Sequence, residues 1–313
     1  MNTREARDNL RAAVTDYLAL RRSLGFKLDD AERLLGDFVD YLNDNDVPTI
    51  TSEAAVAWAT EPAGAQLAWW AKRLGVVRQF ATYLHAFDSH VEIPPADVLA
   101  HGTRRAEAFI YSQADIAALL HAAGKLQPMS AATYTTLVGL LAVTGMRVGE
   151  AIGLDRSDLD HRRGLLTVRF GKFGKSRQLP LHPTTTAALQ AYLRTRDRHI
   201  HEPRSPALLV STAGTRLFYS NVHLAFQKLT RTAQIAPRSA ACRPRLHDLR
   251  HTFAVNTLVG WQRAGLDIQP RLPWLSTYLG HTAPSSTYWY LTATPELLAG
   301  AADRLDNGQE TRP

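Results

Sequence analysis

The 313-residue sequence contains one cysteine, Cys242, so the chain cannot form an internal disulfide, a composition typical of the reducing cytoplasm. The N-terminus is charged and lacks the apolar segment of a secretory signal peptide. The longest stretch without charge, residues 126–146, is interrupted by polar residues, a proline and a glycine, so it predicts a buried helix and no membrane span. A Walker motif, internal repeats and low-complexity tracts are also absent. We therefore expect a cytoplasmic protein without membrane association or ATP-driven chemistry.

Positive charge is in excess and unevenly distributed. The formal net charge is +7 and the isoelectric point is about 9.7, which favours a polyanionic partner. Residues 1–105 contain 12 Lys and Arg against 15 Asp and Glu, a net charge of −3. Residues 106–313 contain 24 against 14, a net charge of +10. Any DNA contact in the first part is therefore expected to use one local basic face.

The first third of the chain has the apolar periodicity of amphipathic helices. We predict helices over residues 6–22, 30–42, 51–58 and 66–87, with Thr51 or Ser52 capping the third. Pro94 and Pro95 end this region, and residues 101–105 are expected to form a linker. The sequence therefore predicts a helical N-terminal domain over residues 1–103 and a second domain over residues 106–313.

The second domain is predicted to be mainly helical with a small antiparallel sheet. Alternating residues over 165–170 and 177–181 indicate two strands, and the turn between them places Lys172 in a β-hairpin. Another short strand is expected at residues 208–211. Helices are expected near residues 112–124, 133–143, 220–233, 247–259, 271–279, 285–290 and 295–305, with one more starting at Arg147.

Four short motifs follow one another in this second domain. They read Thr144-Gly145-Met146-Arg147-Val148-Gly149-Glu150, Gly171-Lys172-Phe173-Gly174-Lys175, His247-Asp248-Leu249-Arg250-His251, and Leu279-Gly280-His281 with Tyr290 nine residues later. Two guanidiniums can hold the nonbridging oxygens of a phosphodiester by forked hydrogen bonds. A tyrosine phenol can form a covalent phosphoester, and a lysine beside arginines can protonate a leaving oxygen. These residue types need no metal or nucleotide.

In this order and spacing, the motifs resemble the active site of the tyrosine recombinases, the phage-integrase and Xer-like family that cuts and rejoins DNA strands. The resemblance covers residues 106–300 and implies Tyr290 as nucleophile and Lys172 as general acid. It implies that the scissile phosphate is bound by Arg147, His247, Arg250 and His281. It also implies the family fold, in which a helical core-binding domain and an α+β catalytic domain form a C-shaped clamp around DNA. The run 285–296 looks most like recombinases carried by bacterial mobile elements.

A metal site competes for the histidines. His247 and His251 are four residues apart, a spacing that can bind zinc on a helix. However, Asp248 is one methylene shorter than the glutamate base of such sites, and the charge of Arg250 would repel a cation. We therefore predict no metal, and His251 is expected to be structural.

For both the general acid and the nucleophile, a second residue of the same type lies nearby in the sequence. Lys172 competes with Lys175, and the family places its acid at the first lysine of the turn. Tyr288 and Tyr290 would lie about 200° apart on a helix, so only one can face the phosphate. The spacing from His281 favours Tyr290, and Tyr288 is expected to pack.

The sequence thus predicts a site-specific DNA recombinase or integrase that acts through a 3′-phosphotyrosine intermediate in integration, excision or transposition of a mobile element, without a cofactor. Expected partners are double-stranded DNA with inverted-repeat half-sites, a homotetramer on synapsed sites, and accessory or sister recombinases. The apolar stripe in 295–305 is expected to pack either on its own domain or on a neighbouring protomer. A type IB topoisomerase and a catalytically inactive DNA-binding regulator are the alternatives. The short chain and helical N-terminal part favour a recombinase over a topoisomerase, and the complete catalytic series argues against an inactive regulator.

Overall fold

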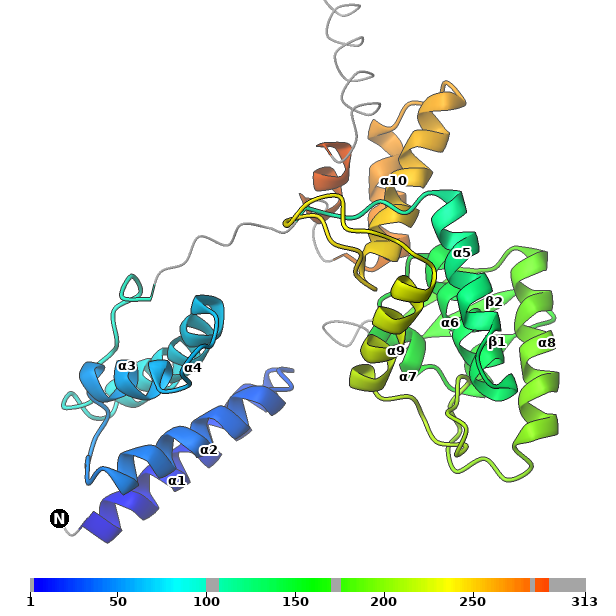
Figure 1. The fold of residues 1–313 in the computed structure, drawn as a ribbon. Helices are drawn as coiled ribbons and strands as arrows, with labels where there is room; N and C mark the ends of the chain where they lie inside the picture. The colour runs from blue at the N-terminus through cyan, green and yellow to red at the C-terminus, as the bar shows by residue number, and fades with distance from the viewer. Residues whose placement is uncertain (1–2, 100–106, 170–175, 282–284, 293–313) are drawn as a thin grey trace, which may run out of the picture. The chain divides into compact units, whose positions relative to one another are not determined.

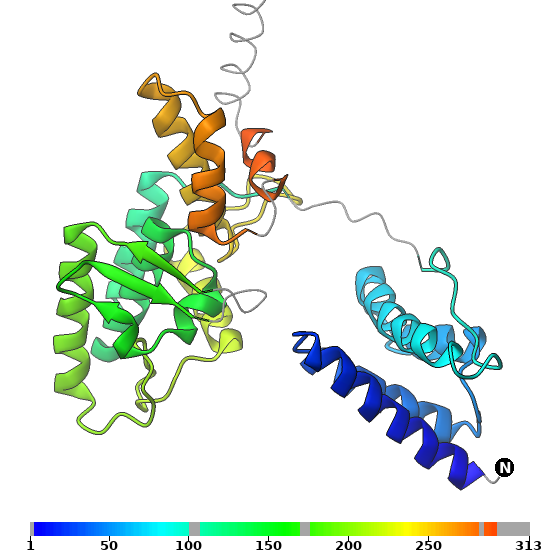
Figure 2. The ribbon, with the colours of Figure 1, turned by 180° about the vertical axis from the view of Figure 1, so that it is seen from behind.

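The computed structural model describes residues 3–99, 107–169, 176–281 and 285–292. The chain divides into two compact units, Met1–Arg105 and Ala106–Pro313, and each is described by itself (Figures 1 and 2). Lys172, Lys175 and the helix expected at 295–305 lie outside the described residues. Within the described ranges, the model contains no helix with the length and apolar character needed to cross a membrane.

Within residues 3–99, the N-terminal unit contains four helices, which confirms the helices expected from periodicity. They are α1 (Thr3–Ser23), α2 (Asp29–Asp44), α3 (Ser52–Thr60) and α4 (Leu67–His85). Thr51 caps α3, because its Oγ1 accepts the backbone N–H of Ala54 at 3.1 Å. The apolar faces of these helices meet in one core, in which Trp58 lies 5.1 Å from Phe38 between ring centroids.

The second unit is built around α6 (Pro128–Thr144), on which α5 (Gln113–Gly124), α8 (Pro183–His199) and α10 (Asp248–Arg263) pack (Figure 1). Ser112 and Asp115 form the expected capping box at the start of α5. Helix α6 begins at Pro128, earlier than predicted. Helix α8 was not predicted, since its first turn contains Pro183 and three threonines and its last turn is basic. The remaining helices are α7 (Val148–Gly153), η1 (Arg156–Asp158), α9 (Tyr219–Thr232), η3 (Gln269–Arg271), α11 (Leu272–Leu279), α12 (Ser285–Tyr288) and η4 (Trp289–Thr292).

A three-stranded antiparallel sheet, visible in Figure 2, completes this unit. Its strands are β1 (Leu159–Asp160), β2 (Leu165–Val168) and β3 (Arg177–Pro180), and Val168 pairs with Arg177 at the end of the hairpin. The predicted hairpin is therefore confirmed, with slightly shorter strands. The strand predicted at 208–211 is wrong. This buried apolar run makes only one isolated bridge, Val210 to Arg216, because the chain turns back directly after it, at Ser211.

The last motifs lie at helix ends. Helix α10 carries His247 at its N-cap, and Gly280 is the C-cap of α11. The single helix expected over 285–290 is two elements, because α12 ends at Tyr288 and η4 begins at Trp289. Tyr290 therefore belongs to a 3₁₀ turn that is packed against α10, and the angular argument for a continuous α-helix does not apply to it.

Candidate active site

Three arginine side chains bind the C-terminal end of α11. The backbone carbonyls of residues 278 and 279, and that of the C-cap residue 280, each accept one guanidinium N–H. The bonds are Arg177 Nε to Tyr278 at 2.8 Å, Arg250 Nη2 to Leu279 at 2.9 Å, and Arg147 Nη2 to Gly280 at 3.1 Å. Cations suit this position because unpaired carbonyls give a helix C-terminus a partial negative charge. Side chains from β3, α10 and the start of α7 are thereby brought to one point.

Two glycines from the motifs allow this close approach. Gly280 ends α11 with φ of 69°, and a Cβ there would lie 2.8 Å from Nη1 of Arg177. Gly145 ends α6 with φ of 58°, and a Cβ there would lie 2.4 Å from the ring of Phe253. The carbonyl of Gly145 also accepts Nη1 of Arg250 at 2.8 Å. Both positions need a left-handed backbone and have no room for a side chain.

Glu150 joins two of the arginines. Its carboxylate accepts the backbone N–H of Arg147 at 2.8 Å, Nη1 of Arg147 at 2.9 Å, and both Nη atoms of Arg177 at 3.0 and 2.8 Å. Burial alone would raise the pKa of Glu150, but the hydrogen bonds from Arg177 and Arg147 lower it to about 2. The carboxylate is therefore ionised at neutral pH.

Arg250 is the most buried of the three arginines, with 2% of its surface exposed. Burial, followed by the nearby charge of Arg147, lowers its pKa to about 10, so the guanidinium still carries its charge at neutral pH. With its two carbonyl acceptors, Arg250 links the end of α6 to the end of α11.

The two site histidines are neutral at pH 7. Burial of the ring and then the charges of Arg250 and Arg147 lower the pKa of His281 to about 4. The same causes lower the pKa of His247 to about 4, although that residue keeps an exposed surface at the start of α10. Nδ1 of His281 lies 2.8 Å from Oγ1 of the buried Thr287.

Tyr290 lies beside His281 and has 2% of its surface exposed. Its ring is nearly parallel to that of His281, with centroids 6.2 Å apart and planes at 16°. His251 packs on Tyr290 and on Trp289, at centroid distances of 5.5 and 5.0 Å, as expected of a structural residue. Tyr288, in contrast, is 47% exposed, so the expectation that it packs is wrong.

The structure brings together five of the six residues predicted from sequence, and Lys172 is the one outside the described residues. Glu150, Arg177 and Thr287 also belong to the cluster and were missed. Glu150 had a signal, because it lies three residues after Arg147, at a position where an acidic side chain can bond back to the start of the helix. Arg177 had no such sequence signal, because Lys172 and Lys175 lie close to it in the sequence and nothing distinguishes it from another surface cation.

The two histidines of the possible zinc motif, His247 and His251, lie next to each other. Their rings are nearly perpendicular, with centroids 4.9 Å apart. Within residues 3–99, 107–169, 176–281 and 285–292, no group of three or more His, Cys, Asp or Glu side chains lies close enough to hold an ion.

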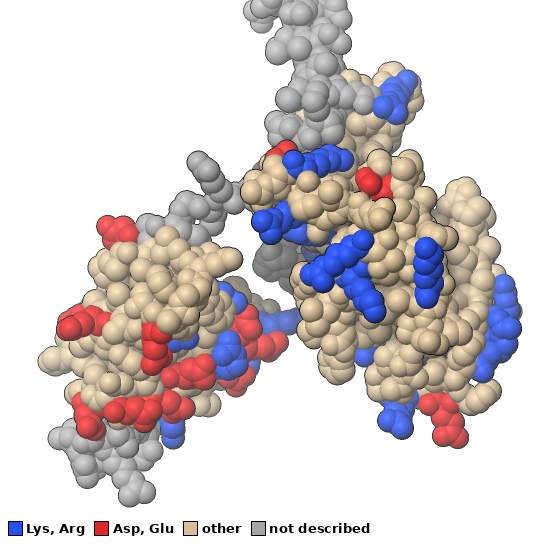
Figure 3. All heavy atoms as spheres, viewed as in Figure 1, with Lys and Arg blue, Asp and Glu red and all other residues tan. Residues whose placement is uncertain are grey.

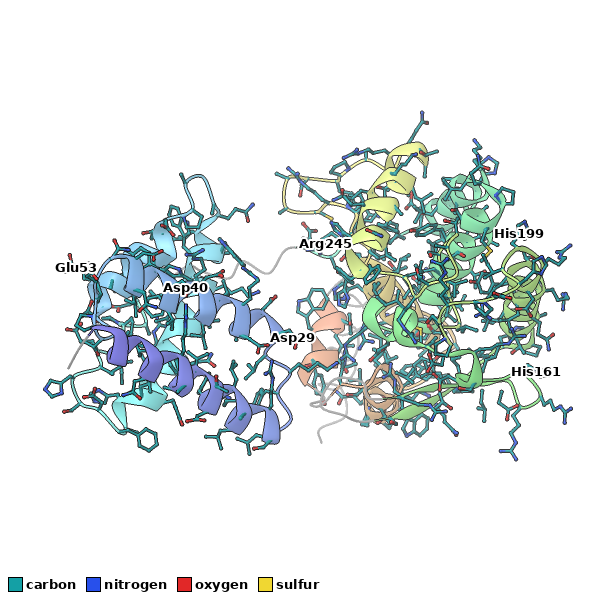
Figure 4. All side chains as sticks on the ribbon, turned by 90° about the horizontal axis from the view of Figure 1, so that it is seen from below. Asp29, Asp40, Glu53, His161, His199 and Arg245 are labelled. Carbon is teal, nitrogen blue, oxygen red and sulfur yellow. The ribbon has the colours of Figure 1, made fainter. Side chains whose placement is uncertain are left out.

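The segment that enters the second unit is tied to the start of α10. Asp248 is fully buried and accepts Nε and Nη2 of Arg245, which is labelled in Figure 4. Arg245 also donates to the carbonyl of Glu107, and the backbone N–H of Tyr111 donates to Oγ1 of Thr252. Figure 3 shows Lys and Arg over the visible face of the second unit, while Asp and Glu gather on the N-terminal unit.

Comparison with known proteins adds the following. Residues 110–296 match the model of the phage integrase family. A Sinorhizobium fredii protein named as an integrase/recombinase, y4rB, is 45% identical over 312 residues, covering 96% of this chain and 98% of that protein. The tyrosine recombinase XerC of Corynebacterium efficiens is 32% identical over 53% of this chain and 48% of its own length. The solved structure of the Tn1549 transposon integrase with a circular intermediate DNA aligns with a TM-score of 0.65 at 16% identity, covering 93% of this chain and 99% of that one.

Proposed function

The chain belongs to the phage integrase family, the tyrosine-type site-specific recombinases, and we propose that it cuts and rejoins DNA strands with Tyr290 as the nucleophile. The observation that carries the proposal is the arrangement of the buried Tyr290 ring beside His281, with three arginines gathered at the end of α11. This combination provides a nucleophile and fixed positive charge for one phosphate.

In the proposed reaction, the phenolic oxygen of Tyr290 attacks phosphorus and forms a 3′-phosphotyrosyl bond. The bond from phosphorus to the 5′ oxygen breaks, and Lys172 gives that oxygen a proton. The free 5′ hydroxyl of a partner strand then attacks the phosphotyrosine and reverses the step. The energy of the phosphodiester is kept in the protein–DNA bond, so the cycle is balanced without ATP.

Arg147 and Arg250 bind the nonbridging oxygens in this proposal. A guanidinium has five N–H donors, and within the described part of the chain Arg250 uses two of them on backbone carbonyls. Its remaining donors can meet the charge that grows on the phosphate during attack. His247 and His281, both neutral, can each add one hydrogen bond.

The role of Lys172 is supported by where its hairpin is fixed. Val168 and Arg177 pair at the end of β2 and β3, and Arg177 is bonded to Glu150 within the site. Lys172 is four residues from Val168, a span of at most about 14 Å for an extended chain. The hairpin that carries Lys172 is therefore anchored at Arg177, a residue of the site cluster.

The proposed substrate is double-stranded DNA with inverted-repeat half-sites, bound by the N-terminal unit and the basic second unit. Two protomers act on each site and four on a synapsed pair, with accessory or sister recombinases as further partners. The biological setting we propose is integration, excision or transposition of a mobile element, supported by the similarity to y4rB.

Covalent trapping on a nicked suicide duplex tests this function. Such a duplex loses the 5′-hydroxyl strand after cleavage, so a phosphotyrosyl adduct accumulates. A recombinase traps only duplexes that carry its own site. A type IB topoisomerase would trap DNA without sequence preference, and an inactive regulator would bind without any adduct.

A further inference from the structure

We propose that Arg177 is a positioning residue that takes up the charge of Glu150, so that the positive charge of Arg147 stays available to the scissile phosphate. This inference rests on the proposed function. It concerns a residue that does not itself touch the reacting atoms.

Arg177 is placed for this role by three bonds. As the first residue of β3, it meets both carboxylate oxygens of Glu150 with its two Nη atoms, at 3.0 and 2.8 Å, and it donates Nε to the carbonyl of Tyr278. Its side chain is 13% exposed and that of Glu150 is 7% exposed. A planar guanidinium can bond both carboxylate oxygens and the carbonyl together through its fork of N–H donors, a geometry that an ammonium group lacks.

The charges explain why the pair matters to Arg147. One carboxylate contacts two guanidiniums, so the group of Arg147, Glu150 and Arg177 carries a net charge of +1. Without Arg177, the carboxylate would pair with Arg147 alone, and their net charge would be zero beside the phosphate. Because the side chains of Arg177 and Glu150 are largely buried, that difference in charge is weakly screened.

Gly280 shows that the protein makes room for this guanidinium. A Cβ at position 280 would lie 2.8 Å from Nη1 and 3.0 Å from Cζ of Arg177. The same residue precedes His281 and gives its carbonyl to Arg147. Arg177 is therefore packed against the turn that orients two of the groups proposed to bind phosphate.

The test compares Arg177→Met, Glu150→Gln and the double variant in the full-length chain. The probe is a duplex selected from a randomised inverted-repeat library by covalent capture on the wild-type protein. In single-turnover cleavage, we expect Arg177→Met to slow adduct formation by at most about 10²-fold, which is what removing a donor in direct contact with the charge costs. The double variant should cleave faster than Arg177→Met, because no unpaired carboxylate then neutralises Arg147.

A merely structural role predicts the opposite, since a second substitution in a buried cluster would leave the double variant as slow as Arg177→Met or slower. That result would overturn the inference.

Arg177→Lys extends the comparison to a variant that keeps the positive charge, and it should cleave faster than Arg177→Met but more slowly than wild type. Arg163→Met is the matched control for loss of one positive charge, because Arg163 lies just before β2 of the same sheet and its side chain is 79% exposed. It should change salt-dependent DNA binding and leave the cleavage rate of bound DNA near that of wild type.

Arg177→Met could cleave slowly because Arg147 is neutralised or because the loop that carries Lys172 is displaced. A second substrate distinguishes these two explanations. A duplex with sulfur in place of the 5′ bridging oxygen releases a thiol, whose pKa of about 8.5 removes the need for a general acid. This substrate should restore cleavage by Lys172→Ala and leave Arg177→Met slow. Rescue of Arg177→Met by the sulfur-containing duplex would refute the proposed action through Glu150.

The proposed function itself fails if the wild-type protein captures no duplex. If the wild-type protein captures DNA normally and the Arg177 variants cleave it at the wild-type rate, only this inference is refuted.

Discussion

Nδ1 of His281 lies 2.8 Å from Oγ1 of Thr287, a threonine with no exposed surface. Because His281 is neutral at pH 7, its ring has one N–H donor and one acceptor nitrogen. We infer that the Thr287 hydroxyl donates to Nδ1, so that the imidazole proton stays on Nε2, where it can donate to a phosphate oxygen. In that arrangement Thr287 sets the tautomer of His281.

We predict that Thr287→Val slows cleavage by about 3- to 10-fold, the value of one neutral hydrogen bond. The valine has a similar shape but cannot donate to Nδ1. Thr287→Ser keeps the hydroxyl and should cleave close to the wild-type rate. Equal rates for the valine and serine variants would show that the hydroxyl does not set the tautomer.

For the nucleophile, we predict that Tyr290→Phe binds DNA with near wild-type affinity and forms no covalent adduct, because only the phenolic oxygen is lost. Tyr288→Phe should form the adduct, since Tyr288 is half exposed and lies outside the site cluster. Gel electrophoresis under denaturing conditions after incubation with suicide DNA separates the two. An adduct in Tyr290→Phe together with none in Tyr288→Phe would reverse the assignment.

Chelation should not affect cleavage. The negative charge of the phosphate is met in our proposal by arginines and a lysine, so single-turnover rates should be equal with and without EDTA. Arg250→Ala, in contrast, should cost on the order of 2.7–4 kcal/mol of transition-state stabilisation. Activity that disappears in EDTA and returns with Zn²⁺ or Mg²⁺ would support a metal site instead.

Gly145→Ala should destabilise the second unit by at least about 1–2 kcal/mol, the strain of a left-handed residue with a Cβ. The actual loss should be larger, because the new Cβ would lie 2.4 Å from the Phe253 ring. Gly260→Ala is the matched control, since Gly260 lies within α10 with open space around it and an alanine there should stabilise the helix. Urea unfolding of both variants gives the comparison.

Acid should destabilise the fold through His281. Its folded pKa of about 4 is below the ordinary value of 6.5, so the unfolded chain takes up protons first as the pH falls. Stability from this group is complete above pH 6.5 and is lost between pH 6.5 and 4. We expect His281 to contribute a loss on the order of 1 kcal/mol between pH 7.5 and 5.5 in urea unfolding, and His247, whose pKa is also lowered to about 4, to add to it.

The control for this pH effect is a histidine on the surface. His281→Asn should show a smaller loss between the two pH values, whereas His161→Asn, at an exposed position labelled in Figure 4, should behave like wild type. An unchanged pH dependence in His281→Asn would assign the effect to other groups.

Periodicity and local motifs were enough to predict the helices of the N-terminal unit and the β-hairpin, because those signals lie within a few neighbouring residues. The strand expected at 208–211 failed for a physical reason. An apolar run shows that a segment is buried, but it does not show whether its backbone pairs with another strand. The partnership of Arg177 with Glu150 joins residues 27 positions apart, and nothing in either local sequence indicates it.

The bonds at the end of α11 bear on how this sequence can change over time. The three arginines are held by main-chain carbonyls, which every amino acid carries, so the side chains at positions 278 and 279 are free to vary as far as these bonds are concerned. The left-handed turn after the helix is the part that cannot vary, and it requires a glycine at position 280. A related sequence can therefore keep the same geometry with few identical residues in this segment.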